Sequence, residues 1–239
     1  MGLFRRGLMV LLLLSGSTGY GIDYTFEFSG NWEDAFNWKN ESKPPPKSAE
    51  HIKARVIHGA TATVSSHVSV DTLYVSNQYS SDLTVSGPDA YLEVSGDLTV
   101  GKIDSDILKD VEGAMVVKDD ARVSVGKRLA IGYTGSSSTL DIYSGTVTAG
   151  WLCHNRHDLD LGGHGGRTTL HGGTLVVGDL KLDGGVLNIA GGTLKIQGGD
   201  HAKALTTYIA EARIIVNGAL YPLPEVDYVI TVTDEFTVI

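Results

Sequence analysis

Ala90-Tyr-Leu-Glu-Val-Ser-Gly-Asp-Leu-Thr-Val-Gly101 is the first of four related stretches that decide the fold. The others are Ala121-Arg-Val-Ser-Val-Gly-Lys-Arg-Leu-Ala-Ile-Gly132, Gly145-Thr-Val-Thr-Ala-Gly-Trp-Leu152 and Gly173-Thr-Leu-Val-Val-Gly-Asp-Leu-Lys-Leu-Asp-Gly184. Each stretch reads as two short strands joined by a tight turn at or beside a glycine. Such repetition is typical of a chain that stacks its strands in successive layers, so it says more about architecture than about chemistry.

Apolar residues alternate with polar ones within these strands, and a period of two places the apolar residues on one face. We therefore expect an inner face built from Leu92, Val94, Val123, Val125, Leu129, Ile131, Leu140, Ile142, Leu175, Val177, Leu187, Ile189, Leu194 and Ile196. The residues between them are expected to point outward: Glu93, Ser124, Asp141, Asn188 and Lys195.

Two all-β architectures fit this pattern, an antiparallel sandwich and a parallel β-helix. Asp183-Gly184 is a possible hairpin turn, which favours the sandwich. Against it, leucines recur every few residues from Leu170 to Leu194, and strands this brief are typical of the faces of a solenoid. The first two stretches also begin at Ala90 and Ala121, a span that suits one solenoid turn of about three strands. We predict a right-handed parallel β-helix over residues 61–199.

The composition argues against nucleic-acid binding. The chain has 239 residues, 30 of them glycine, and a formal charge of −9. The first 21 residues hold two arginines and no acidic residue, so the remainder carries 17 basic and 28 acidic side chains, a net charge of −11. Such a chain repels phosphate backbones. The only cysteine, Cys153, forms no internal disulfide and is expected to be a small buried residue.

Residues 1–21 read as a secretory signal peptide. Arg5 and Arg6 give a positive start, Leu8 to Leu14 an apolar core, and Ser15 to Gly19 a small-residue cleavage zone. The apolar run is too short to span a bilayer, which needs roughly 20 residues. The alternative is an uncleaved N-terminal anchor. We expect a secreted, extracellular or cell-surface protein with no membrane span after signal cleavage.

The two ends of the predicted solenoid differ from its middle. Residues 22–60 form an aromatic N-terminal cap in which Trp32 and Trp38 either cover the first layer or offer a stacking platform to a sugar ligand. Residues 200–239 form a C-terminal cap of one short helix and further strands. Asp200 is the expected N-cap of that helix, and Leu205 and Ile209 belong to its apolar stripe.

The chain resembles secreted glycine-rich β-helix proteins of planctomycetes and verrucomicrobia that carry autotransporter-type repeats. The resemblance rests on Gly30-Asn-Trp32 with Asn37-Trp38, on the rung-like stretches Thr139–Val147 and Thr169–Leu175, and on Gly192-Thr-Leu-Lys-Ile-Gln-Gly-Gly-Asp200. It implies an extracellular, mostly non-catalytic solenoid. The N-terminal tryptophan pattern is also similar to the G8 domain, a glycine-rich extracellular module.

One polar segment could hold a divalent metal ion, the possible cofactor that the sequence suggests. It supplies imidazole and carboxylate groups from His154, His157, Asp158, Asp160 and His164, with His171 beyond them. Zinc sites take about four such ligands. The spacing matches no established metal motif, and the alternative is a solvated loop between two layers.

Two functions remain open at this point. The first is a non-catalytic structural or adhesive module of the cell surface or extracellular matrix, with polysaccharide or another surface component as partner. The second is a polysaccharide lyase or hydrolase, or a carbohydrate-binding accessory module, on the same scaffold. Catalysis needs convergent charged groups on one outer face. The candidates are scattered and their register is unknown: Glu93, Lys118, Asp119, Asp120, Arg122, Lys127, Arg128, Asp141, Lys181 and Asp183.

Overall fold

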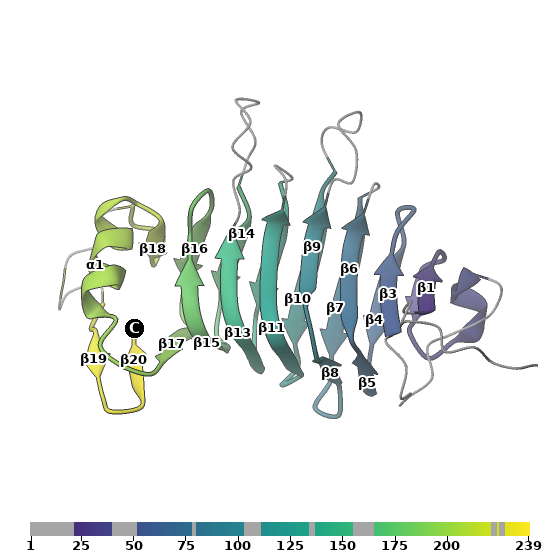
Figure 1. The fold of residues 1–239 in the computed structure, drawn as a ribbon, viewed down its shortest axis with the longest axis horizontal. Helices are drawn as coiled ribbons and strands as arrows, with labels where there is room; N and C mark the ends of the chain where they lie inside the picture. The colour runs from purple at the N-terminus through teal and green to yellow at the C-terminus, as the bar shows by residue number, and fades with distance from the viewer. Residues whose placement is uncertain are drawn as a thin grey trace, which may run out of the picture.

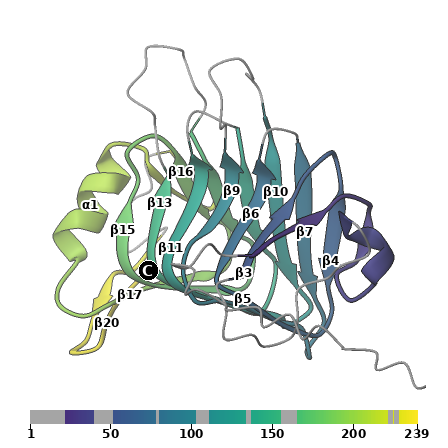
Figure 2. The same ribbon diagram turned by 45° about the vertical axis from the view of Figure 1, so that its right-hand side comes forward.

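A computed structural model describes residues 22–39, 52–77, 80–102, 111–133, 137–154, 165–220, 224 and 228–239. The protein is all-β, as predicted, and its strands form two sheets that are almost entirely parallel. One α-helix, α1 (Ala202–Ala210), lies in the described part of the chain. Figures 1 and 2 show the sheets running side by side along the molecule, with α1 at one end and β1 at the other. The predicted signal peptide, residues 1–21, lies outside the described residues.

The larger sheet, here sheet A, follows the order β1-β3-β6-β9-β11-β13-β15-β17-β20-β19, with β5 and β8 attached beside this path. Its strands are β1 (Ile22–Phe26), β3 (Ile52–Val56), β5 (His67–Val70), β6 (Thr72–Asn77), β8 (Tyr91–Val94), β9 (Leu98–Lys102), β11 (Arg122–Tyr133), β13 (Thr146–His154), β15 (Thr174–Lys181), β17 (Thr193–Gln197), β19 (Thr231–Val232) and β20 (Phe236–Val238).

The smaller sheet, here sheet B, follows the order β18-β16-β14-β12-β10-β7-β4-β2. Its strands are β2 (Gly30–Asn31), β4 (Thr61–Val64), β7 (Ser81–Ser86), β10 (Gly113–Lys118), β12 (Thr139–Ile142), β14 (Arg167–Leu170), β16 (Val186–Ile189) and β18 (Ile214–Val216). The chain therefore passes alternately through sheet A and sheet B, and we call one such passage a circuit.

The four related stretches of the sequence stack on one another in sheet A. Tyr91 pairs with Arg122, Arg122 with Thr146, and Thr146 with Thr174, all in parallel. The first of these steps spans 31 residues, the spacing of the first two copies in the sequence. The repetition thus places equivalent residues of successive circuits beside one another.

The inner faces of the two sheets form one hydrophobic core. All the alternate apolar residues expected inside are buried, and Leu92, Leu129, Leu175, Leu187 and Leu194 are completely so. Asn188 lies on the outward side of β16 as expected. It is nevertheless only 8% exposed, because its short side chain lies between Thr169 and Ile215 of the neighbouring strands.

Glycine stands where successive circuits approach each other too closely for a side chain. A Cβ on Gly126 would lie 2.3 Å from the carbonyl oxygen of Ser95, and one on Gly150 would lie 2.7 Å from that of Lys127. Backbone oxygens cannot move aside as a flexible side chain can. The central glycine of the repeated stretch is therefore required by stacking.

The N-terminal end is closed by aromatic side chains. Phe26, Trp32 and Trp38 belong to the core cluster, and the Nε1–H of Trp38 donates a hydrogen bond of 2.8 Å to the carbonyl oxygen of Trp32. The strands of sheet A already begin here, since β1 pairs in parallel with β3 and β3 with β6. Residues 22–60 thus combine an aromatic cluster with the first strands of both sheets.

The C-terminal end is covered by α1 and by a hairpin. Leu205 and Ile209 of α1 are buried in the common core, as the sequence predicts. The prediction that Asp200 is the N-cap is wrong by one residue: His201 is the N-cap and makes no side-chain cap hydrogen bond, while Oδ1 of Asp200 accepts a 2.9 Å hydrogen bond from the N–H of Ala202. The last strand, β20, pairs antiparallel with β17 and with β19, and this reversal ends the parallel series of sheet A.

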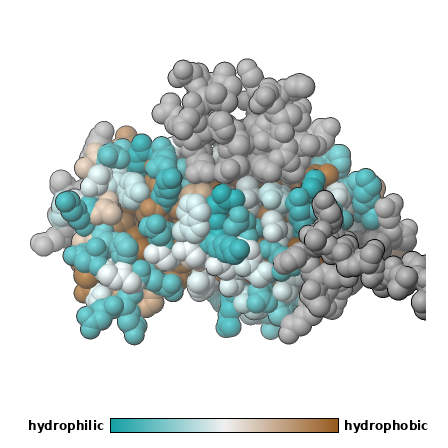
Figure 3. All heavy atoms as spheres, in the orientation of Figure 1, coloured by the Kyte–Doolittle hydropathy of each residue, from teal (hydrophilic) through white to brown (hydrophobic). Residues whose placement is uncertain are grey.

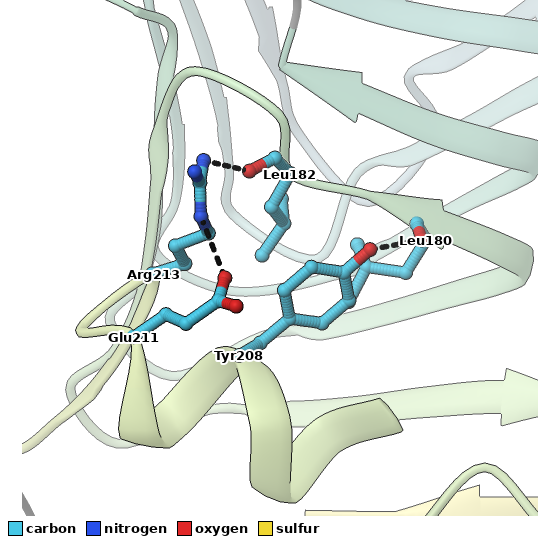
Figure 4. Close-up of polar contacts among 5 residues, drawn as sticks. All are labelled: Leu180, Leu182, Tyr208, Glu211 and Arg213. Carbon is cyan, nitrogen blue, oxygen red and sulfur yellow. Dashed lines mark hydrogen bonds and ion pairs between the residues drawn. The ribbon is translucent and has the colours of Figure 1, made fainter. Parts of the chain in front are cut away.

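Side chains at the end of α1 fasten the helix to the last circuits (Figure 4). The hydroxyl of Tyr208 donates a 3.1 Å hydrogen bond to the carbonyl oxygen of Leu180. Arg213 donates through Nη1 to the carbonyl oxygen of Leu182 and forms a 3.0 Å ion pair with Glu211. The helix is thereby held to the end of β15 and to the residue that follows it.

Candidate functional site

The register brings one outward charge and one aromatic ring of the repeats together on sheet A. Arg128 lies on β11 beside Trp151 of β13, and its Nη2 donates a 2.8 Å hydrogen bond to Oδ2 of Asp97. The guanidinium carbon lies 5.8 Å from the centroid of the Trp151 indole, within the range of a cation–π contact. Asp97, Arg128 and Trp151 thus form a row across three successive circuits.

A second group of charges lies on β1, β3 and β6 of the same sheet. Asp23 accepts from Arg55 at 3.1 Å and lies 3.8 Å from Lys53. The Lys53 ammonium is 5.2 Å from the centroid of the Tyr74 ring. In Figure 3 hydrophilic side chains are spread over the whole face shown, and hydrophobic ones show mainly toward the end that carries α1.

The groups whose pKa clearly departs from its ordinary value on the described residues are Cys153, His154 and Lys181. Burial raises the pKa of the Cys153 thiol to about 11, against the opposing effect of nearby Arg128 and Lys181. The hydrogen bond and ion pair with Asp183, at 3.1 Å, raise the pKa of Lys181. Cys153 is therefore a buried thiol at neutral pH, and Lys181 a cation. Neither is tuned as a nucleophile or a general base.

The predicted sugar-stacking platform is not formed by Trp32 and Trp38. Their side chains are 2% and 1% exposed. The two indoles meet edge to face at 4.6 Å, and the Phe26 ring packs against Trp32 at 6.1 Å and Trp38 at 5.1 Å. A sugar needs an open ring face, and these rings use their faces to close the core.

The predicted metal ligands are only in part described. His154 points into the core, where its Nε2 lies 2.8 Å from Oγ1 of Thr168 and burial lowers the pKa of the ring to about 3. His157, Asp158, Asp160 and His164 lie outside the described residues. Within the described ranges, no three histidine, cysteine or acidic side chains are grouped as metal ligands. The inward direction of His154 separates it from any ligand set on the surface.

Sheet B carries an aromatic cluster that sequence reasoning missed. The rings of Tyr143 and His171 stack at 4.2 Å with 2° between their planes, and Nε2 of His171 lies 3.0 Å from Oδ1 of Asp141. Tyr143 is 51% exposed. Aligning Thr139-Leu-Asp-Ile-Tyr143 with Arg167-Thr-Thr-Leu-His171 would have revealed this contact, because β12 and β14 pair in that register.

A similar cluster lies on sheet A. His67 of β5 pairs with Tyr91 of β8, and their rings stack at 4.9 Å. Nε2 of His67 lies 3.5 Å from Oε2 of Glu93. Both clusters present a planar ring beside a carboxylate, which suits recognition of a hydroxyl-rich ligand better than bond cleavage.

No family model, no curated protein and no solved structure matches this chain. No helix in the described ranges is both long and apolar enough to span a membrane.

Proposed function

We propose that the protein is a secreted, non-catalytic structural or adhesive module of the cell surface or extracellular matrix, built as a right-handed parallel β-helix. The alternation between sheets A and B and the parallel pairing of equivalent residues support a solenoid. The right hand follows from the general rule for crossovers between parallel strands of one sheet. Secretion is supported by the signal-like pattern of residues 1–21.

The observation that carries the adhesive function is the ordering of outward side chains into rows across successive circuits. Asp97, Arg128 and Trp151 form one such row on sheet A, and Asp141 with His171 and Tyr143 forms a cluster on sheet B. A surface of this kind offers a ligand several contacts at fixed positions on one scaffold. Multiple weak contacts on one scaffold add up to strong attachment.

The second function, a polysaccharide-active enzyme or accessory module, is favoured by the same Asp97–Arg128–Trp151 row. Arginine and carboxylate beside an indole are suitable for binding a sugar chain. The carboxylate, however, is neutralised by Arg128 at 2.8 Å. Such an ion pair favours positioning of a ligand over proton transfer.

Incubation of the purified protein with insoluble cell-wall polysaccharides tests the two functions together. We expect depletion of protein from the supernatant and no new reducing ends or unsaturated products. Arg128→Ala and Trp151→Ala should weaken the depletion, whereas Lys118→Ala, an exposed residue of sheet B, should not. Product release that disappears in Asp97→Asn would establish catalysis and contradict the proposed function.

Secretion is tested separately by expressing the full chain with residues 1–21 intact. We expect the protein in the culture medium or on the cell surface, with a mass that corresponds to a start near Tyr20 or Ile22. Retention of the whole chain inside the cell would contradict the proposed location.

A further inference from the structure

The outer face of sheet B has two neighbouring columns of side chains. The first contains Asp141, Thr169 and Asn188, which are paired in β12, β14 and β16. Tyr143, His171 and Ala190 come two residues after Asp141, Thr169 and Asn188, directly beyond the ends of the same three strands. They therefore form a second column on the same face. The ladder continues through this second column, because the N–H of His171 bonds to Ile142 O and that of Ala190 to Leu170 O.

The two faces of the His171 imidazole have different neighbours along the second column. Tyr143 covers one ring face at 4.2 Å. The next position on the other side is Ala190, an exposed residue with a single side-chain carbon. The position after that is Asn217, whose N–H bonds to Ile189 O. Adjacent strands lie about 4.8 Å apart, so His171 and Asn217 are separated by roughly 9.6 Å. That separation accommodates one ring stacked on His171 above Ala190.

A polar group lies next to this slot in the first column, and a carboxylate lies at the edge of its imidazole wall. The carboxylate belongs to Asp141 of β12, on the far side of His171 from Ala190, and its Oδ1 is 3.0 Å from Nε2 of His171. Asn188 lies two residues before Ala190, and its Oδ1 is buried without a hydrogen-bond partner. A buried acceptor without a partner is costly. A rotation of the Asn188 amide toward the slot would allow a ligand hydroxyl to satisfy it.

We propose that the slot over Ala190, bounded by His171 and Asn217, binds one pyranose ring of a neutral polysaccharide. The C–H face of the sugar stacks on the imidazole, and one of its hydroxyls donates a hydrogen bond to Oδ1 of Asn188. The ligand is neutral because the Asp141 carboxylate lies 3.0 Å from Nε2 of the imidazole that binds it and the chain carries a net charge of −9, which together repel uronic acids. This inference rests on the proposed adhesive function and names its ligand class.

The second Tyr–His stack provides a matched control. Tyr91 has His67 on one side, and the next residue in its column is Arg122, a long exposed side chain at the position that corresponds to Ala190. The same pair of rings with the same kind of carboxylate, Glu93, is therefore expected to bind no sugar.

Native affinity electrophoresis in gels that contain a neutral polysaccharide, xylan or glucomannan, tests the proposal. We expect the full chain to be retarded there and not in polygalacturonate. His171→Ala removes the stacking face, and Ala190→Tyr fills the slot with a ring of the protein's own. His171→Ala should weaken retardation roughly tenfold, the loss of about one aromatic contact, and Ala190→Tyr should weaken it at least as much by excluding the sugar, whereas His67→Ala should leave it unchanged. The melting temperatures of the variants identify any that fail to fold.

The outcomes separate the slot from the wider function. Equal retardation of wild type, His171→Ala and Ala190→Tyr would contradict the proposed sugar site and would leave the proposed adhesive function unaffected. Loss of binding in His67→Ala alone would place the sugar on sheet A. Absence of retardation in every neutral polysaccharide, or retardation only in polygalacturonate, would also overturn the proposal. New reducing ends would instead contradict the non-catalytic function.

Discussion

The middle circuits and a later circuit differ in the residues that face the core. Two inward rows, one in each sheet, contain only apolar side chains in the middle circuits and a polar side chain in the later circuit. In sheet A, the row Val56, Val75, Val100 and Ile131 continues into His154. In sheet B, the row Leu83, Met115 and Leu140 continues into Thr168. Both polar residues occur in the same circuit and contact each other, with Nε2 of His154 2.8 Å from Oγ1 of Thr168.

The parallel pairing of the strands therefore determines whether a side chain points inward, but it does not require that side chain to be apolar. An inward position accepts a polar side chain when the facing sheet supplies a partner, because the hydrogen bond offsets much of the cost of burial. The remaining imidazole nitrogen, Nδ1, has no partner and stays buried. The later circuit is therefore expected to respond to pH where the middle circuits do not.

The largest effect is expected where the two regions are alike. Leu129→Ala in the middle and Leu175→Ala in a later circuit each remove a fully buried side chain of the same core. Each should lower the free energy of unfolding by about 2–5 kcal/mol through lost burial and a residual cavity. Urea unfolding followed by circular dichroism measures both. An unchanged midpoint for Leu175→Ala would show that the later circuits do not share the core.

The alternation of residues was enough to predict the core, since period two determines which side chains face inward. The sequence did not predict the stacking of Tyr143 on His171, because register depends on how many residues each circuit spends in its turns. Equivalent positions lie 31 residues apart at Tyr91 and Arg122, but 24 apart at Arg122 and Thr146. The burial of Asn188 was not predicted for the same reason, because its neighbours in the adjacent strands were not known.

The second-largest loss of stability is expected at the glycines on which successive circuits stack, which occur in the middle and later circuits alike. Gly126→Ala and Gly150→Ala place a Cβ at 2.3 Å and 2.7 Å from backbone oxygens of the preceding circuit. Each should destabilise the protein by about 1–3 kcal/mol, as expected for an overpacked site. Thermal unfolding checks this, with Thr148→Ala, an outward residue of β13, as a control that should change stability by roughly 0.5 kcal/mol or less. Equal melting temperatures for all three variants would refute the stacking requirement.

The buried imidazole predicts a pH effect that belongs to the later circuit. Burial lowers the pKa of His154 from 6.5 to about 3, so the folded protein keeps the ring neutral while the unfolded chain binds a proton below pH 6.5. Stability from this group is complete above pH 6.5 and falls as the pH drops toward 3. Between pH 7.5 and pH 5 the loss should be about 2 kcal/mol.

The double variant His154→Val, Thr168→Val tests that effect, because it extends the apolar character of both rows and leaves no orphaned partner. Urea unfolding at pH 7.5 and pH 5 should show a smaller loss of stability in the double variant than in wild type, by about 2 kcal/mol. His171→Ala is the matched control, since its ring lies on the surface beside Asp141. An identical pH dependence in the double variant and wild type would show that His154 is not the group responsible.

The smallest effect concerns the attachment of α1 to the last circuits. Tyr208→Phe keeps the ring that packs against the core and removes only the hydroxyl that donates to the carbonyl oxygen of Leu180 at 3.1 Å. The expected loss is about 0.5–1.5 kcal/mol, the net contribution of one hydrogen bond. Hydrogen exchange should detect it as faster exchange in α1, with no change in the middle strands β9 and β11. If exchange accelerates equally in β9 and β11, then α1 and the middle circuits unfold as one cooperative unit, and the difference between the two regions lies in side-chain chemistry and not in local stability.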